Sequence, residues 1–130
     1  MILLDTHIWV WLVGDTQYLR PRHRELLDQH EVSGLGVSVI SCWEVAKLVE
    51  KGRLALQQPV GEWIAAALKR PHISLVSLTP EIAVDATQLP RGFHSDPADQ
   101  LIVSTSRILN IPLLTADAKI LNYPHVSLLT

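Results

Sequence analysis

The sequence predicts a doubly wound α/β domain, in which helices cover both faces of one parallel sheet. Short apolar runs alternate along the chain with longer segments of helical periodicity, the pattern expected of β-α-β units. The runs are continuously apolar rather than alternating with polar residues, as strands covered on both faces are. The chain has 130 residues, 48% of them hydrophobic, which suits one core and argues against two domains. A single domain spanning residues 1–130 is therefore predicted.

Local signals define the elements of the first quarter of the chain. The apolar run at residues 2–4 is too short for a helix and closes at Asp5, so it is predicted to be a buried strand. A helix is expected over residues 6–13. Its aromatic and aliphatic residues surround it on all sides, which predicts burial or a surface covered by a partner. Pro21 then precedes a second helix, over residues 22–30.

The middle of the chain continues the alternation. Residues 37–40 are rich in β-branched side chains and predict the second strand. Ser41, followed three residues later by Glu44, has the pattern of a capping box, so a helix is expected to start at Ser41 and to end before Gly52. Residues 59–69 carry an apolar stripe at helical spacing and predict another helix.

The last part of the chain is expected to supply three further strands and two helices. Residues 73–78 and 111–115 are predicted strands, and residues 126–129 a short edge strand. Thr79 and the proline after it start a helix that is expected to run to about Leu89.

A long apolar helix follows the sequence Asp96-Pro97-Ala98-Asp99. Pro97 fits the first helical position, which makes Asp96 the N-cap and places Asp99 in the first turn. Both acids can therefore be explained as helix-start chemistry alone, near the positive end of the helix dipole.

Five carboxylates fall where strands end or where the next helix begins. They are Asp5, Glu44, Asp96, Asp99 and Asp117. In a parallel sheet the carboxyl ends of the strands share one edge, and ligands bind there. Capping explains each acid separately, but it does not explain why all five share one edge. The pattern therefore favours a shared metal site over five independent helix caps.

The type of ligand indicates the type of metal. Carboxylates gathered without basic partners repel one another, and a divalent cation relieves that repulsion. Oxygen ligands alone select Mg²⁺ or Mn²⁺ over zinc. The chain has no Cys-x-x-Cys or paired-histidine pattern for zinc, no phosphate-binding Gly-x-x-x-x-Gly-Lys loop and no Gly-x-Ser-x-Gly nucleophile elbow.

The overall charge sets a condition on any nucleic-acid ligand. The formal net charge is −2, without the basic excess that nucleic-acid binders usually carry. A bound metal ion would supply the missing positive charge. Basic side chains are expected to line the rim of the groove. They are Arg20, Arg22, Arg24, Lys47 and Lys51.

Compartment signals are few and consistent with one another. Cys42 is the only cysteine, so no intramolecular disulfide can form, which fits a reducing compartment. The first basic residue is Arg20, which leaves the N-terminus without the basic region of a signal peptide, and no segment reaches membrane-spanning length. A cytoplasmic protein without a membrane span is expected.

Taken together, these motifs resemble the PIN-domain ribonucleases, and among them the VapC-type toxins of bacterial toxin–antitoxin pairs. The resemblance spans essentially the whole chain and depends on the joint order and spacing of four stretches. These are Leu4-Asp5-Thr6-His7, Glu44 after Ser41, His94-x-Asp96-Pro97-x-Asp99 leading into Gln100-Leu101-Ile102, and Leu114-Thr115-Ala116-Asp117.

The resemblance implies a parallel sheet sandwiched by helices, and an acidic quartet that binds Mg²⁺ or Mn²⁺ and cuts single-stranded or looped RNA. The quartet corresponds to Asp5, Glu44, Asp99 and Asp117. Asp96 matches an additional acid, a helper or a helix cap, and Thr6 and Thr115 match small hydroxyl residues beside the metal. Gln100 departs from the arginine often found there, which questions one local contact but not the metal site.

The resemblance also implies partners: a homodimer and a small antitoxin protein that wraps the groove. On this interpretation the quartet holds one or two ions that activate water for attack on a phosphodiester, with Glu44 binding a second ion or positioning the water. Two alternatives stay open. One is an α/β interaction domain without catalysis, whose acids only cap helices. The other is a Mg²⁺-binding signalling module, although Asp5 lacks the adjacent acid that such modules carry.

Overall fold

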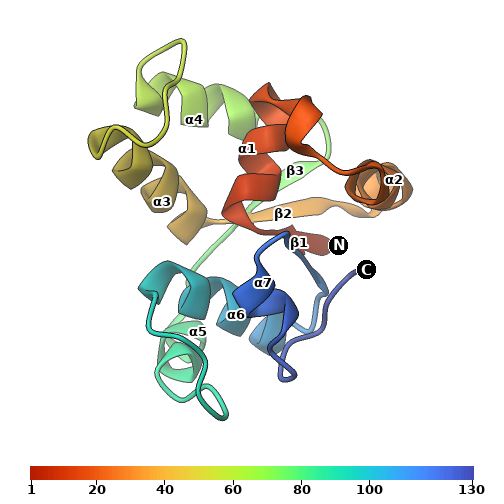
Figure 1. Ribbon diagram of the computed structural model, residues 1–130, viewed down its shortest axis with the longest axis vertical. Coiled ribbons are helices and arrows are strands. Elements are labelled where there is room, and N and C mark those ends of the chain that lie inside the picture. The colour runs from red at the N-terminus through yellow and green to blue at the C-terminus, as the bar shows by residue number, and fades with distance from the viewer.

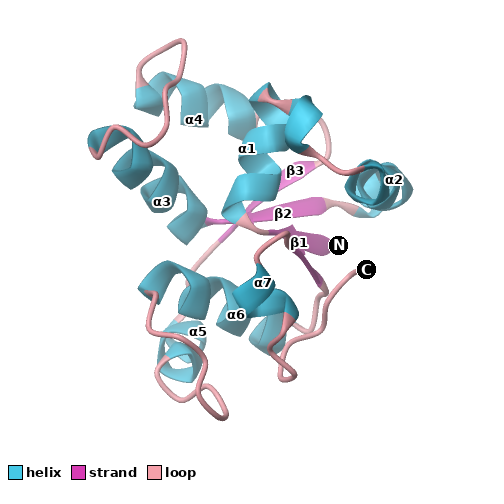
Figure 2. Ribbon diagram, in the orientation of Figure 1, coloured by secondary structure: helices cyan, strands magenta, loops and turns pink.

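A four-stranded parallel sheet forms the centre of the computed structural model, which describes residues 1–130, and helices pack on both of its faces (Figures 1 and 2). The strands are β1 (Ile2–Leu4), β2 (Leu35–Ser38), β3 (Ile73–Val76) and β4 (Leu113–Leu114). The helices are α1 (Thr6–Gly14), α2 (Pro21–His30), α3 (Val39–Glu50), α4 (Val60–Leu68), α5 (Pro80–Ala86), α6 (Pro97–Leu109) and α7 (Ala118–Leu121). The predicted fold class, a parallel α/β/α sandwich in a single domain, is confirmed.

The strand order is β3-β2-β1-β4, so β1 lies between two partners in the interior of the sheet. Leu4 is paired with Val37 of β2 on one side and with Leu114 of β4 on the other. The backbone N–H of the next residue, Asp5, donates to Leu114 O at 2.9 Å. The chain therefore leaves β1 and β4 at the same level, and Asp5 and Thr115 emerge side by side at the carboxyl edge of the sheet.

Successive residues of β1 point to opposite faces, and each face has its own core. Ile2 and Leu4 pack into the larger core beneath α1, α2 and α4, whereas Leu3 packs with Ile102 and Ile120 of the opposite layer. All five side chains are almost completely buried. Burial of such an aliphatic side chain contributes about 1.5–3 kcal/mol, so the sheet is anchored from both sides at the strand that carries Asp5.

The start of α3 differs from the prediction, and this changes the meaning of Glu44. The helix begins at Val39, and its N-cap is Ser38, whose side chain accepts a hydrogen bond from Ile40 N. Ser41 therefore lies inside the helix, and the predicted capping box with Glu44 is wrong. Two serines three positions apart both fit an N-cap locally, and β2 ends at the first of them because its pairing with β3 extends only to Ser38. Glu44 lies in the second turn, where no capping role applies.

Three elements in the C-terminal half are shorter than predicted. Helix α5 ends at Ala86 rather than about Leu89, where the Thr87 hydroxyl donates to Val84 O. Strand β4 has only two residues, because Pro112 before it lacks the N–H that a longer ladder needs. Residues 126–129 form a single parallel bridge through Leu128 rather than the predicted edge strand.

Trp9 shows the burial predicted for the apolar helix, whereas the position predicted for the arginines of α2 is wrong. Trp9 of α1 is a core residue with an edge contact to Trp63, at a centroid distance of 5.2 Å, so only Trp11 of the two tryptophans reaches the surface. Helix α2 lies near the two termini, at the amino ends of the strands (Figure 1), and Arg22 donates to Thr130 O. The arginines of α2 therefore do not rim the carboxyl edge, because α2 leads directly into the amino end of β2.

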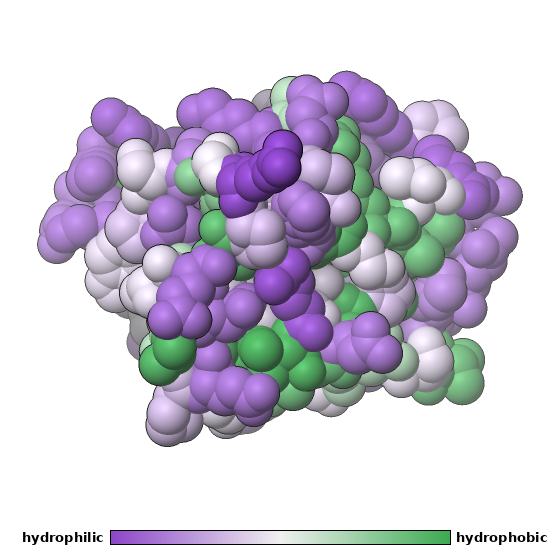
Figure 3. Space-filling view, turned by 90° about the horizontal axis from the view of Figure 1, so that it is seen from below, coloured by the Kyte–Doolittle hydropathy of each residue, from purple (hydrophilic) through white to green (hydrophobic).

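The face at the bottom of Figure 1, formed by α5, α6 and the loops beside them, is mainly hydrophilic with separate apolar areas (Figure 3). No helix is long and apolar enough to cross a membrane.

Candidate metal centre

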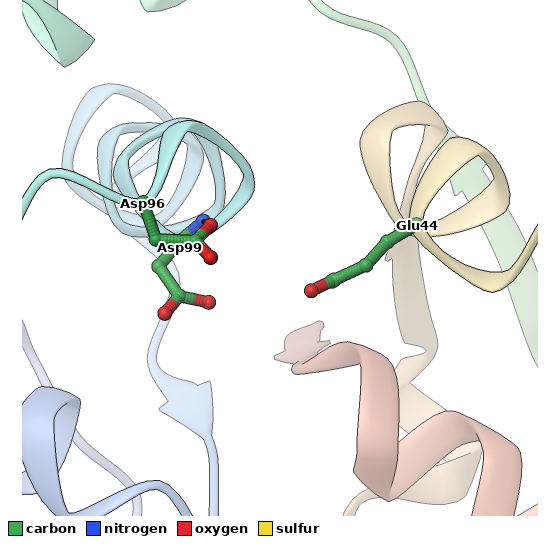
Figure 4. Close-up of side chains that lie close together, drawn as sticks. All are labelled: Glu44, Asp96 and Asp99. Carbon is green, nitrogen blue, oxygen red and sulfur yellow. Dashed lines mark hydrogen bonds between the residues drawn. The ribbon is translucent and has the colours of Figure 1, made fainter. Parts of the chain in front are cut away.

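Three carboxylates from two helices meet beyond the carboxyl edge of the sheet. Glu44 extends from α3, and Asp96 and Asp99 lie at the start of α6 facing it (Figure 4). One carboxylate oxygen from each residue lies within 4.8 Å of the others, a spacing that allows all three to contact one ion. We call these three residues the carboxylate trio.

Asp5 lies at the end of β1 and is held rigidly. The residue is buried, with only 5% of its surface accessible to solvent. One oxygen accepts a hydrogen bond from Thr6 N at 2.8 Å and so caps α1, and the other accepts one from the Thr115 hydroxyl at 2.6 Å. Both donors are neutral, so they orient the carboxylate without compensating its charge.

Glu44 is oriented by a pair of buried hydroxyls. The Thr6 hydroxyl donates to Glu44 Oε1 at 2.5 Å and lies 2.8 Å from Ser41 Oγ. A threonine hydroxyl has one proton, so the Ser41 hydroxyl must be the donor in its contact with Thr6. The result is a chain of hydrogen bonds from Ser41 through Thr6 to Glu44, which joins α3 to the first turn of α1.

The start of α6 is organised by its own N-cap. Asp96 Oδ1 accepts a hydrogen bond from Asp99 N at 3.1 Å, as the sequence predicted. His94 Nδ1 accepts a hydrogen bond from Asp96 N at 3.4 Å, which places the proton of a neutral ring on Nε2. His94 Nε2 lies 3.0 Å from Asp99 Oδ2, although the ring is not aligned for a linear hydrogen bond.

Asp117 follows β4, the strand that pairs with β1 on the side away from β2. It caps the short helix α7, since its Oδ1 accepts a hydrogen bond from Lys119 N at 2.8 Å. Its own N–H donates to the Thr115 hydroxyl at 3.0 Å. Thr115 therefore connects Asp117 to Asp5, in the same way that Thr6 connects Asp5 to Glu44.

Electrostatic coupling joins all five acids. Burial and, to a smaller extent, the charges of the other four carboxylates together raise the pKa of Asp99 to about 8. Burial also raises the pKa of Glu44 in spite of the hydrogen bond from Thr6, and the charges of Asp5 and Asp96 act in the same direction as burial. The pKa of Asp5 is raised by burial in spite of the hydrogen bonds from Thr115 and Thr6. The cluster holds more negative charge than its surroundings neutralise.

This donor set fits a hard divalent cation. All the converging ligands are carboxylate oxygens, no lysine or arginine is paired with any of them, and three of them have raised pKa values. Oxygen-only sets of this kind suit Mg²⁺ or Mn²⁺, and a bound ion would offset both the burial and the mutual repulsion that raise the pKa values.

Three of the five predicted acids meet in one group, and two do not. The structure brings Glu44, Asp96 and Asp99 into the trio, whereas Asp5 and Asp117 lie outside it and are coupled to it through charge. Asp96, expected as a helper or helix cap, is both a cap and a member of the trio. Reasoning from the sequence missed the hydroxyl of Ser41 beneath Thr6, because that contact joins residues 35 positions apart.

Two further residues stabilise the loop that leads into α6. Gln100, at the position where arginine was expected, donates from its amide to His94 O at 3.0 Å and so fastens the loop to the helix. The Phe93 ring packs on His94 and on Tyr123, whose hydroxyl bonds to Pro90 O. These contacts hold His94 against the trio.

The fold and these residues define a class: α/β proteins with an acidic centre at the carboxyl edge of a parallel sheet. The strand order β3-β2-β1-β4 excludes the flavodoxin-like order of signalling receivers. Among known families, the model described as the PIN domain matches residues 2–126 of the chain. The chain belongs to the PIN-domain family.

Individual relatives agree with this assignment. The chain is 32% identical to ribonuclease VapC22 of Mycobacterium tuberculosis (strain ATCC 25618 / H37Rv) over 124 residues, which cover 95% of this chain and 92% of the relative. Among solved structures, it is similar to VapBC2 from Rickettsia felis bound to a promoter DNA fragment, with a TM-score of 0.74, 18% identity and 99% and 98% of the two chains covered. DNA-bound VapBC from Salmonella typhimurium has a TM-score of 0.70, 16% identity and the same coverage. The predicted family is confirmed.

Proposed function

We propose that this chain is a divalent-metal-dependent endoribonuclease that hydrolyses RNA phosphodiester bonds, and that it is the toxin of a toxin–antitoxin pair. The observation that carries the proposal is the gathering of five charge-coupled carboxylates at one sheet edge, in a chain that is 32% identical to a ribonuclease over nearly its whole length. Buried like charges reduce the stability of a fold, so their presence together is better explained by a ligand than by capping.

The residues proposed for the site are Asp5, Glu44, Asp99 and Asp117, with Asp96 as an additional ligand. When bound, Mg²⁺ or Mn²⁺ would activate water for in-line attack and offset the charge that develops on phosphate oxygens. The chain's own part is to hold oxygen ligands in fixed positions. One Asp96 oxygen caps α6, which leaves its other oxygen for an ion.

Thr6 and Thr115 are proposed as supporting residues. Thr115 fixes the Asp5 carboxylate at the end of the central strand, and Thr6 fixes Glu44 across the space between α1 and α3. Glu44 is the member of the trio that comes from α3, whereas Asp96 and Asp99 come from the start of α6, and this position suits either a second ion or the positioning of the attacking water. Supporting hydrogen bonds of this type hold a ligand set at the geometry that a metal requires.

The proposed partners follow from the relatives. Solved structures of similar fold are complexes of VapB with VapC and a toxin–antitoxin complex from Klebsiella pneumoniae. We propose that a cognate antitoxin protein covers the acidic edge of this chain, that the chain forms a homodimer, and that it acts on RNA in the cytoplasm.

The test compares wild type with Asp5→Asn. Asparagine keeps an oxygen that can cap α1 but lacks the negative charge, so the variant is expected to fold and to lose RNA cleavage. Asp28→Asn, on the exposed surface of α2, is the matched control for loss of a charge. Purified proteins are incubated with single-stranded RNA in Mg²⁺, in Mn²⁺ and in a chelator, and the products are resolved on gels.

Wild type and Asp28→Asn should cut RNA in either metal and not in the chelator. Cleavage by Asp5→Asn at the wild-type rate would show that the site assignment is wrong. Equal cleavage in metal and in chelator would show that the metal dependence is wrong. If the wild-type chain neither cuts RNA nor gains thermal stability in Mn²⁺, the non-catalytic interaction domain becomes the better interpretation.

A further inference from the structure

Three aromatic side chains form a row that starts beside the carboxylates. His7 and Trp11 lie four residues apart on α1 and so share one face of the helix, and Tyr18 follows in the short 3₁₀ turn η1 (Thr16–Tyr18). The ring centroids are 5.9 Å apart for His7 and Trp11 and 6.0 Å apart for Trp11 and Tyr18. We call these three residues the aromatic row.

The position of the row relates it directly to the acidic centre. His7 follows Thr6, whose hydroxyl donates to Glu44, and α1 starts where β1 ends (Figure 1). The charge of His7 is close enough to lower the pKa values of both Asp5 and Glu44. The row therefore extends away from the carboxylates along α1.

The row lines one wall of an open hollow of about 340 Å³. The opposite wall comes from the end of α3 and the segment after it, through Leu48, Arg53 and Leu54. Tyr18 is 59% exposed and His7 is exposed, whereas Trp11 is partly buried against the large core. Core packing behind Trp11 fixes the middle ring. The guanidinium group of Arg53 belongs to the opposite wall of the hollow.

The ring spacing distinguishes between forms of nucleic acid. Neighbouring bases along one strand of a stacked helix are about 3.4 Å apart, much closer than the rings of the row. A strand whose bases rest on these rings one by one must therefore be single and opened out. The rings are tilted by 51° and 31° relative to their neighbours, so each can present a face of its own. Aromatic faces beside a cation are the usual platform for single strands.

We propose that His7, Trp11 and Tyr18 form a nucleobase-binding subsite that holds single-stranded RNA on one side of the bond to be cut. The inference rests on the proposed function and adds to it the conformation of the substrate and the surface that selects it. A strand whose phosphodiester lies at the carboxylates has to continue across the surface next to Thr6, and the row is on that surface. Arg53 is placed to contact its phosphates.

The test measures RNA binding separately from cleavage. Tyr18→Leu removes a ring and Tyr18→Phe keeps it, and both variants are expected to fold because Tyr18 is exposed. Trp11→Leu and Trp11→Phe form a second pair for the half-buried ring. Trp43→Leu is the matched control, because Trp43 is also exposed, at 53%, but lies on α3 outside the row.

All variants are made in the full-length Asp5→Asn background, which is expected not to cut. Fluorescence anisotropy then measures the Kd for a labelled 12-nucleotide single strand and for a duplex of the same sequence, in the presence of Mg²⁺. Each leucine variant should raise the single-strand Kd roughly tenfold, the effect expected for loss of one base-stacking contact. The phenylalanine variants and Trp43→Leu should stay within about twofold of the parent, and duplex binding should be weak throughout.

The outcomes separate this inference from the proposed function. If wild type cuts RNA but the leucine variants bind the single strand as tightly as the parent, the subsite is overturned and the nuclease stands. If wild type does not cut RNA but the leucine variants still lose single-strand binding, the subsite stands and the proposed reaction fails. If the leucine variants bind RNA normally but change oligomeric state or lose a co-expressed antitoxin, the row is a protein interface and the inference is wrong.

Discussion

Asp99→Asn should stabilise the metal-free protein. The Asp99 carboxyl is buried and faces four other carboxylates, which together with burial raise its pKa from 3.8 to about 8. Between these two values the folded chain keeps a proton that the unfolded chain has lost. The free energy of unfolding therefore decreases as the pH rises from about 4 to about 8, and it stays constant above that range with respect to this group.

The size of the effect follows from the same pKa values. At pH 7 the side chain is about three pH units above its ordinary pKa, and one unit corresponds to about 1.4 kcal/mol, which gives about 4 kcal/mol. Water and counterions screen part of this interaction, because Asp96 at the edge of the cluster is exposed. An effect of about 2 kcal/mol remains. For a domain of this size it corresponds to a rise in Tm of roughly 5–10 °C.

The assay is thermal unfolding of wild type, Asp99→Asn and the surface control Asp28→Asn in a chelator, from pH 4 to pH 9. The advantage of Asp99→Asn over wild type should be near zero at pH 4 and should reach its full value by pH 8. In Mn²⁺ the wild type should be more stable than Asp99→Asn, because the ion stabilises the native state of the protein that keeps all of its ligands. An advantage that is absent at pH 8, or equal at pH 4 and pH 8, would refute the electrostatic account of the cluster.

Two further outcomes test the support of the site and the core beneath it. His94→Ala should raise the Mn²⁺ concentration needed for half-maximal thermal stabilisation roughly tenfold, because Asp99 loses the side chain that faces it. His94→Gln keeps a donor at a similar position and should restore much of the loss. Ile102→Ala, in the core between α6 and β1, should lower the free energy of unfolding in urea by about 2–5 kcal/mol, whereas Leu109→Ala, on the exposed side of the same helix, should change it by less than about 1 kcal/mol.

Some elements were predictable because their signals are local. The strand Ile2–Leu4 is an apolar run closed by an acid, and both features lie within five adjacent residues. The start of α6 was predictable for the same reason, since Asp96 and Pro97 fit the N-cap and the first helical position, and the structure has them there. Patterns of this kind depend on backbone chemistry that neighbouring residues alone determine.

Other features depend on contacts that no local pattern contains. The sequence Ser41-x-x-Glu44 fits a capping box, yet the partner of Glu44 is Thr6, which lies 38 residues away. Trp9 and Trp11 look alike in the sequence, but Trp9 meets Trp63 in the core and Trp11 reaches the surface. Which face of an all-apolar helix is covered is decided by the packing of distant segments. The edge on which the acids meet was predictable only after the sheet was assumed to be parallel.

The hydrogen bonds within the acidic centre explain why it is suited to an ion. Asp5 accepts hydrogen bonds from the Thr115 hydroxyl and from Thr6 N, and Glu44 accepts one from the Thr6 hydroxyl. Asp96 accepts one from a backbone N–H. Neutral donors of this kind fix the direction of a carboxylate but leave its charge uncompensated. A lysine or arginine paired with these carboxylates would compensate their charge and would also occupy the place of a cation. The choice of neutral partners therefore keeps the charge of the carboxylates available, and in the absence of an ion this charge adds to the effect of burial in raising the pKa of Asp99.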